Sequence, residues 1–211
     1  MAIVIDGSSA AGTVNLGTNG TISNLAVGGL PNGIVDTDML AANAVTAAKA
    51  SGGRSLLGAD QWRISSSFTM STSGADITDN RERVDTDGFD KLGSGMSESS
   101  GIFTFPDTGI WYIEFVFSAL ADTGDSKWNE LVLHTTLDNS SYDDAAYAYC
   151  GNFFNSEDYR SSGNGNFIFK VSNTSTHKCK FRQYAYGSDV EFRGNGTINL
   201  NAFTFLKLGD I

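Results

Sequence analysis

Apolar and polar side chains alternate along several short segments of the chain after residue 61. Because a β-strand points successive side chains to opposite faces, this alternation predicts strands with one buried and one exposed face. It is clearest in WRISSSFTM at 62–70, IWYIEFVFSAL at 110–120, ELVLHTTLD at 130–138, NFIFKV at 166–171 and HKCKFRQYAY at 177–186. Loops rich in Gly, Asn, Ser and Asp separate these segments. The pattern therefore predicts an all-β domain, an antiparallel β-sandwich of the jelly-roll type.

The same alternation predicts which side chains form the core. The residues expected on the core faces are Trp62, Ile64, Phe68, Met70, Trp111, Ile113, Phe115, Phe117, Ala119, Leu131, Leu133, Leu137, Phe167, Phe169, Val171, Cys179, Phe181 and Ala185. Just before the longest segment lies the turn sequence FPDTG at 105–109. Pro106 presets the first central position of a turn, and Gly109 accepts the left-handed conformation. We therefore expect the aromatic segments on either side of this turn to form a hairpin.

The first 58 residues have a different composition. All 24 aromatic residues lie between Trp62 and Phe205, and the early segment holds single aliphatic residues spaced along a polar backbone. These are too sparse to offset by themselves the entropy lost on ordering the segment. We therefore expect residues 1–58 to form an extended arm that lies against another surface or winds with its own copies, and residues 59–211 to form the sandwich. The aliphatic residues expected to contact a capsid or the other arms are Ile3, Ile5, Val14, Leu16, Ile22, Leu25, Leu30, Ile34 and Val35.

A short helix is predicted within the arm, near residues 37–50. Asp36 or Thr37 can cap its start, Lys49 suits its last turn, and Gly52 with the following glycine ends it. An isolated helix this short is marginal in water, so it either packs against symmetry mates or remains a frayed linker. In the packed case, the trimer contacts are expected from one narrow face that includes Leu40, Ala44 and Ala47.

Composition and charge exclude several classes of protein. The chain has 24 acidic and 14 basic residues, a formal net charge of −10, which argues against binding of nucleic acid. No apolar run approaches the roughly 20 residues of a transmembrane helix, so no membrane insertion is expected. The opening MAIVIDG has no basic residue and does not resemble a signal peptide. Cys150 and Cys179 are expected to be free, buried thiols, with a single disulfide as the alternative.

Few residues suggest chemistry. His134 and His177 are the two histidines, and their spacing supports neither a catalytic triad nor a zinc site. The acidic runs DTDGFD at 85–90 and LDNSSYDD at 137–144, and Asp122 with Asp125, do not follow calcium-loop spacing and are interpreted as solvated loop carboxylates. Paired carboxylates also serve glycoside hydrolysis, but a sequence does not give their separation. We expect no catalytic residue, no cofactor and no metal.

One interval is crowded with aromatic residues between Gly and Asn. They are Tyr142, Tyr147, Tyr149, Phe153, Phe154 and Tyr159. Such rings either stack on sugars at a loop-built site or fill a seam between subunits, where Tyr and Phe are favoured. The seam is the preferred interpretation.

The predicted sandwich of residues 59–211, which we call the head, resembles a known family. GIFTFPDTGIWYIEFVFSAL at 101–120 is similar to the central hairpin of the jelly-roll heads of complement-type and tumour-necrosis-factor-like proteins, and FTFLKLGDI at 203–211 is similar to their last strand. The resemblance implies a homotrimer whose protomers meet along apolar strands. AFTFLKL at 202–208 carries apolar residues on both faces, which indicates a core face and a partner face. Phe203 and Phe205 are expected among the trimer contacts.

The arm resembles something else. GGLPNGIVDTDMLAANAVTAAKASGG at 28–53 is similar to N-terminal segments of virion structural proteins of marine and freshwater tailed phages. Arm and head together imply a non-enzymatic, trimeric protein of the virion surface, assembled in the bacterial host cytoplasm. The expected role is that of a capsid decoration (cement) protein bound to the major capsid protein, or to a tail protein, through the arm. The alternative is a short tail fibre or receptor-binding protein whose head binds host surface glycan.

Overall fold

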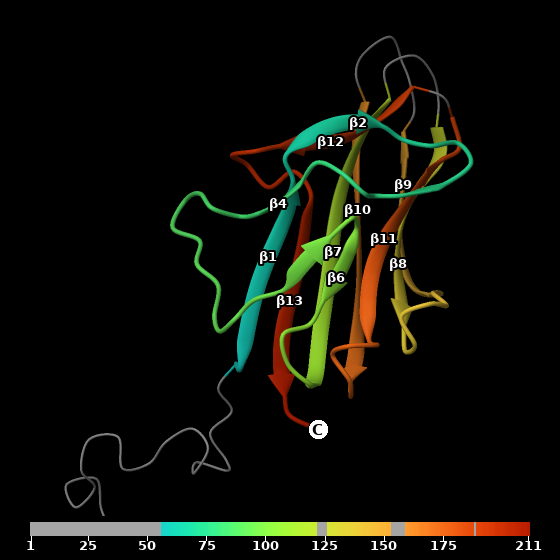
Figure 1. The fold of residues 1–211 in the computed structure, drawn as a ribbon. Helices are drawn as coiled ribbons and strands as arrows, with labels where there is room; N and C mark the ends of the chain where they lie inside the picture. The colour runs from blue at the N-terminus through green and yellow to red at the C-terminus, as the bar shows by residue number, and fades with distance from the viewer. Residues whose placement is uncertain (1–55, 122–125, 153–158, 188) are drawn as a thin grey trace, which may run out of the picture. The chain divides into compact units, whose positions relative to one another are not determined.

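A computed structural model describes residues 56–121, 126–152, 159–187 and 189–211. The elements in these ranges are β-strands, and no helix occurs among them. They form two antiparallel sheets that lie face to face (Figure 1), and the side chains between the sheets form a common hydrophobic core. The predicted all-β sandwich is therefore confirmed. The arm up to residue 55, with the helix expected near 37–50, lies outside the described residues.

Sheet A has seven strands. Its order is β2 (Ser66–Thr69), β12 (Val190–Asn195), β7 (Gly109–Ala121), β13 (Ala202–Gly209), β1 (Gly58–Ile64) and β4 (Arg81–Arg83), and β10 (Tyr159–Val171) also pairs with β7. The pairing of β10 with β7 runs from Tyr159 opposite Ala121 to Val171 opposite Gly109, the full length of both strands. Within the described residues, β7 is the only strand that pairs with β10, so β10 lies at an edge of sheet A.

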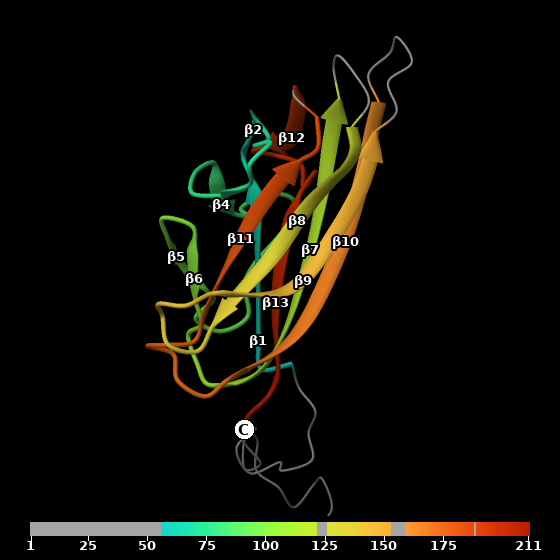
Figure 2. The ribbon, with the colours of Figure 1, turned by 90° about the vertical axis from the view of Figure 1, so that its right-hand side faces the viewer.

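Sheet B has six strands and faces the viewer in Figure 2. Its order is β5 (Ser97–Ser99), β6 (Ile102–Thr104), β11 (Lys178–Ala185), β8 (Ser126–Thr136) and β9 (Asp143–Asn152), and β3 (Ala75–Asp76) also pairs with β11. Strands distant in sequence therefore lie side by side, as β8 and β11 do from Asn129 opposite Ala185 to Thr136 opposite Lys178.

Aromatic side chains from both sheets fill the core. Phe115 of β7 and Phe203 of β13 point inward from sheet A, and both pack on Phe181 of β11 in sheet B, with ring centroids 5.5 Å and 4.2 Å from it. All the predicted core residues except Leu137 are buried or packed against this core. Because aromatic and β-branched residues suit a pleated, half-buried surface, the alternation predicted these faces well.

Leu137 is the exception, with 64% of its surface exposed. Strand β8 ends one residue earlier, at Thr136. The Thr136 hydroxyl accepts hydrogen bonds from the backbone N–H groups of Asp138 and Asn139, at 3.2 Å and 3.0 Å. The chain therefore turns before Leu137 can continue the alternation.

The turn at FPDTG does not form the predicted hairpin. It joins β6, which pairs with β5 and β11 in sheet B, to β7, which pairs with β10, β12 and β13 in sheet A. The prediction was wrong because turn chemistry reverses a chain without specifying its pairing partners. Here the reversal crosses the core, so that Phe105 and Trp111 meet inside it with ring centroids 5.3 Å apart.

Two glycines of β10 allow a close approach on the core side of this strand. A Cβ atom added at Gly163 would lie 2.6 Å from the carbonyl oxygen of Tyr149 in β9, and one at Gly165 would lie 2.4 Å from the ring of Phe115. No side chain fits in either space. The absence of side chains at these two positions brings β10 close to β9 of the other sheet and to the ring layer of the core.

Candidate functional site

The outer face of sheet A carries a cross-strand row of apolar residues. Strand pairing aligns Ile168 of β10 with Tyr112 of β7, Tyr112 with Leu206 of β13, and Leu206 with Ala59 of β1. We call Ala59, Leu206, Tyr112 and Ile168 the apolar row. Ile168, on the edge strand β10, is 60% exposed, so the row forms a contiguous apolar strip that is open at this end.

Polar residues flank the apolar row on one side. The next row of the same face consists of Gln61, Thr204, Glu114 and Asn166. Gln61 donates a hydrogen bond through its side-chain amide to the Thr204 hydroxyl, at 2.9 Å. Toward the end of β13, Leu208 continues the apolar character with 48% of its surface exposed. The outer face of sheet A is thus apolar at one end of the sheet and polar at the other.

The structure corrects one part of the predicted trimer contacts. Phe203 and Phe205 have no exposed surface and lie in the core of a single chain, so they offer nothing to a second copy. The alternation of AFTFLKL into two apolar faces was sound, but the outward residues are Leu206 and Leu208. Leu40, Ala44 and Ala47, and the arm residues Ile3, Ile5, Val14, Leu16, Ile22, Leu25, Leu30, Ile34 and Val35, lie outside the described residues.

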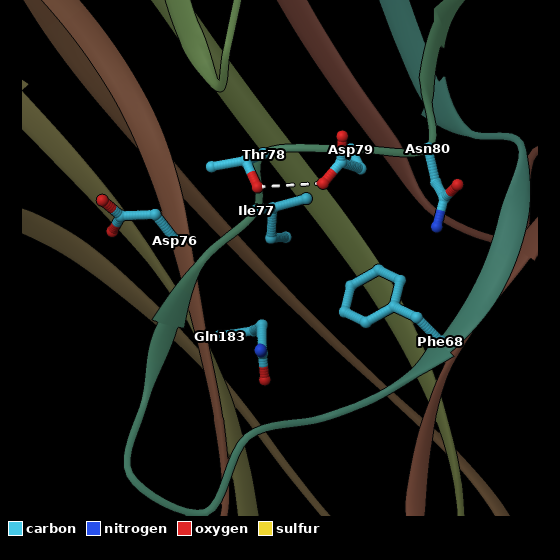
Figure 3. Close-up of a pocket in the computed structure, with 7 residues that line it drawn as sticks. All are labelled: Phe68, Asp76, Ile77, Thr78, Asp79, Asn80 and Gln183. Carbon is cyan, nitrogen blue, oxygen red and sulfur yellow. Dashed lines mark hydrogen bonds between the residues drawn. The ribbon is translucent and has the colours of Figure 1, made fainter.

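A cavity of about 210 Å³ opens where β2, β11 and the segment after β3 meet (Figure 3). The Gln183 side chain accepts a hydrogen bond from the Ser71 backbone at 2.8 Å, and Asp76 forms an ion pair with Lys180 at 2.8 Å. Thr78 donates to the Asp79 carboxylate at 3.2 Å, the dashed line of Figure 3. The lining of this cavity includes no histidine or cysteine. These residues stabilise the loop and do not form a nucleophile–base pair.

Both histidines are engaged within the fold. The Nε2 atom of His134 lies 3.0 Å from the carboxylate of Asp144 on the neighbouring strand, and burial of the ring lowers the pKa of His134 more than Asp144 raises it. His177 lies within hydrogen-bond distance of the hydroxyls of Ser172 and Thr176, at 3.0 Å and 3.1 Å. Each therefore has a structural partner.

The acidic residues do not gather into a metal site within the described ranges, where no group of three or more His, Cys, Asp or Glu side chains is placed to hold an ion. Asp85 pairs with the buried Arg63 at 2.6 Å. Asp138 accepts hydrogen bonds from the backbone N–H groups of Ser141 and Ser140 and from the Thr136 hydroxyl, which hold the pKa of Asp138 far below its usual value. Asp122 and Asp125 lie outside the described residues.

The cysteines are free thiols, Cys179 buried and Cys150 half-buried. The described residues contain no helix that is long and apolar enough to span a membrane.

The crowded aromatic interval is only partly described, because Phe153 and Phe154 and the side chain of Tyr159 lie outside the described part. Tyr147 and Tyr149 point outward from β9, with 41% and 56% of their surfaces exposed. Three rings that sequence reasoning missed lie near them on the outer face of sheet B. We call the full set the aromatic face; it consists of Trp128, Tyr147, Tyr149, Tyr184 and Tyr186.

The architecture defines a two-sheet jelly roll, and known structures share it. No protein-family model matches the chain, and no curated protein matches it. The chain is similar to the solved structure of Eiger, a TNF from S. frugiperda, with 15% sequence identity, a TM-score of 0.53, and coverage of 72% of this chain and 93% of that one. Murine APRIL at pH 5.0 matches at 12% identity and a TM-score of 0.48, over 72% of this chain and 98% of that one. The likeness to Eiger shows that the two sheets of this chain form a TNF-like β-sandwich.

Proposed function

We propose that this protein is a non-enzymatic, homotrimeric structural protein of a tailed-phage virion, and specifically a capsid decoration protein. Residues 1–58 attach to the major capsid protein or to a tail protein, and the β-sandwich projects outward from the particle. The sequence of residues 28–53, with its similarity to virion proteins of tailed phages, supports the location. The TNF-like sandwich and the apolar row support the trimer.

The apolar row is the observation that carries the trimer. Four apolar residues from four adjacent strands are aligned across one sheet, and the outermost of them, Ile168, is mostly exposed in the single chain. Burying a side chain such as Ile168 contributes about 1.5–3 kcal/mol, so three copies that share this surface gain a substantial part of an interface. Leu206 and Leu208, rather than Phe203 and Phe205, are the β13 residues that take part.

The oligomeric state tests this proposal. The full-length protein should sediment at three times its chain mass at micromolar concentration. Ile168→Asp places a carboxylate in the interface and should yield a monomer with an unchanged β-sheet circular dichroism spectrum. Leu137→Asp is the matched control, because Leu137 is equally exposed but lies beyond the end of β8, and it should remain a trimer. A monomeric wild type, or a trimer that tolerates Ile168→Asp, contradicts the trimer.

Deletion of residues 1–50 tests the location. The aliphatic residues of the arm are too sparse for a core of their own, so the apolar area that they bury must lie against the particle or the other arms. Three linked arms also raise one another's effective concentration. We expect the truncated protein to keep the melting temperature of its sandwich and to lose attachment to virions. Images of virions labelled through the full-length protein should show the label over the capsid; wild-type attachment by the truncated protein contradicts the role of the arm.

A second candidate function is a short tail fibre or receptor-binding protein. The exposed rings of the aromatic face favour it, since a structural cap has no need of them. Label confined to the tail in the same images supports this second function over the first.

A further inference from the structure

The aromatic face lies on the outer side of sheet B, the sheet that faces the viewer in Figure 2. Its rings come from three adjacent strands. Tyr147 and Tyr149 belong to β9, Trp128 belongs to β8, and Tyr184 and Tyr186 lie at the end of β11. Strand pairing places these segments side by side, with Glu130 opposite both Tyr149 and Tyr184.

The exposed rings form an ordered array. The rings of Tyr147 and Tyr149 are parallel to within 2°, with centroids 5.5 Å apart. Trp128 meets the edge of Tyr149 at 6.5 Å and stacks on Tyr184 at 4.9 Å, with an interplanar angle of 20°. Tyr186 lies 6.1 Å from Trp128 and beneath the ammonium group of Lys127. Each ring thus has an aromatic neighbour, and Trp128, Tyr147, Tyr149 and Tyr186 remain exposed to solvent.

Hydrogen bonds fix the end of this array. The Tyr147 hydroxyl donates to the Asp144 carboxylate, and this bond raises the pKa of Tyr147 to about 12. Asp144 is in turn held by His134 at 3.0 Å. The ring of Tyr147 is therefore oriented before any ligand arrives, which lowers the entropy cost of binding.

The face also has unused polar groups. Glu130 lies between the rings of Tyr149 and Tyr184, and within the described ranges it makes no hydrogen bond or ion pair. Partial burial and the nearby Asp144 raise the pKa of Glu130, against the effect of Arg182. The Tyr149 hydroxyl likewise has no hydrogen-bond partner in that part of the chain. An acceptor and a donor thus stand among flat apolar surfaces.

This combination suits a sugar better than other ligands. A pyranose ring has an apolar C–H face that can lie on an aromatic ring, and a rim of hydroxyls that can donate to a carboxylate and accept from a phenol. In a two-fold contact with a second copy of the chain, the Glu130 carboxylate would meet the same acidic face and gain no basic partner. Nucleic acid and acidic sugars are disfavoured by these carboxylates and by the net charge of −10.

We propose that the aromatic face is a binding site for a neutral oligosaccharide, whose sugar rings stack on Tyr147, Tyr149 and Trp128 and whose hydroxyls donate to Glu130. This goes beyond the structural role proposed above and gives the second candidate function a specific site and ligand class. It does not require the trimer, whose apolar row lies on the other sheet. A failed sugar-binding experiment therefore leaves the virion proposal intact, and the trimer is tested separately by sedimentation.

The test uses the full-length protein on an array of neutral and sialylated glycans, followed by calorimetric titration with cello-, malto-, galacto- and chito-hexasaccharides. We expect binding to at least one neutral hexasaccharide, accompanied by a change in the fluorescence of Trp128. Tyr149→Ala should weaken that binding about tenfold or more, because each stacked ring contributes on this scale. Tyr149→Phe keeps the ring and should retain most of the affinity, whereas Glu130→Gln should weaken it by loss of the acceptor charge.

Leu137→Ala is the matched control, since it removes an exposed apolar side chain outside the aromatic face. It should bind as the wild type does. Melting temperatures establish that Tyr149→Ala is folded, as expected for a side chain that is 56% exposed. The proposal is overturned if no neutral glycan binds, if only sialylated glycans bind, or if Tyr149→Ala binds as tightly as the wild type. Dissociation of the oligomer by Tyr149→Ala without any glycan binding would identify the face as a protein interface and also overturn it.

Discussion

Gly165→Ala should destabilise the sandwich although it adds a single methyl group. Gly165 faces the core from β10, and an added Cβ would lie 2.4 Å from one carbon of the Phe115 ring and 2.9 Å and 3.1 Å from two others. Carbon atoms pack at about 3.5–4.0 Å, so the ring would have to move by roughly 1 Å. Phe115 has no exposed surface and packs at a tilt against Phe181, with ring centroids 5.5 Å apart, so the ring has little room for that movement.

The expected size follows from two opposing effects. Overpacking a filled core costs about 1–3 kcal/mol. Replacing Gly by Ala where the backbone permits it returns about 0.4–1 kcal/mol by restricting the unfolded chain. Gly165 has an ordinary extended backbone, so the overpacking effect dominates and the free energy of unfolding should fall by about 1–2 kcal/mol. At this chain length each kcal/mol lowers the melting temperature by about 2–4 °C.

Urea titration followed by tryptophan fluorescence measures this change, at one protein concentration because assembly affects stability. Gly209→Ala is the matched control, since a Cβ there meets nothing within 4 Å. It makes the same change to the unfolded chain and should be neutral or slightly stabilising. In a double-mutant cycle, Phe115→Leu should make room for the new methyl group and couple favourably to Gly165→Ala by about 0.5–3 kcal/mol. Equal stability of Gly165→Ala and Gly209→Ala, or strict additivity in the cycle, would refute the close approach.

Three other predictions concern buried groups. Trp111→Ala should lower the free energy of unfolding by about 3–5 kcal/mol, and Tyr112→Ala, on the outer face, by much less; equal melting temperatures contradict the assignment of faces. Burial lowers the pKa of His134 below 6.5, so the contribution of this residue to stability is present above that pH and is lost as the pH falls. Urea titrations should therefore show a smaller loss of unfolding free energy toward about pH 5 in His134→Gln than in the wild type. Burial raises the pKa of the Cys179 thiol, and the thiol is fully enclosed, so a disulfide reagent should label the half-buried Cys150 first in the folded protein, as mass spectrometry can show; prior labelling of Cys179 contradicts this.

The aromatic face shows how far a candidate site can be read from a sequence. The crowding of Tyr147 and Tyr149 on one strand drew attention to their segment. Trp128 and Tyr184 were missed because they are 56 positions apart in the chain and stack only where β8 pairs with β11. Their outward phase, opposite to the inward residues of each strand, was the available signal.

The sequence by itself determined the strands and their two faces, because the alternation of side chains along a strand is a local property of the backbone. It therefore predicted the inward set around Trp111 and the apolar character of both faces of β13. Only the tertiary structure decided which sheet each strand joins and which apolar face is covered. Turn residues at FPDTG reverse the chain, yet the crossing from sheet B to sheet A depends on β10 and β13 as partners for β7. Likewise, Phe203 and Phe205 became core because the opposing sheet presents Phe181 to their face of β13. Leu206 and Leu208 point to the other face, where Leu208 stays exposed among the described residues.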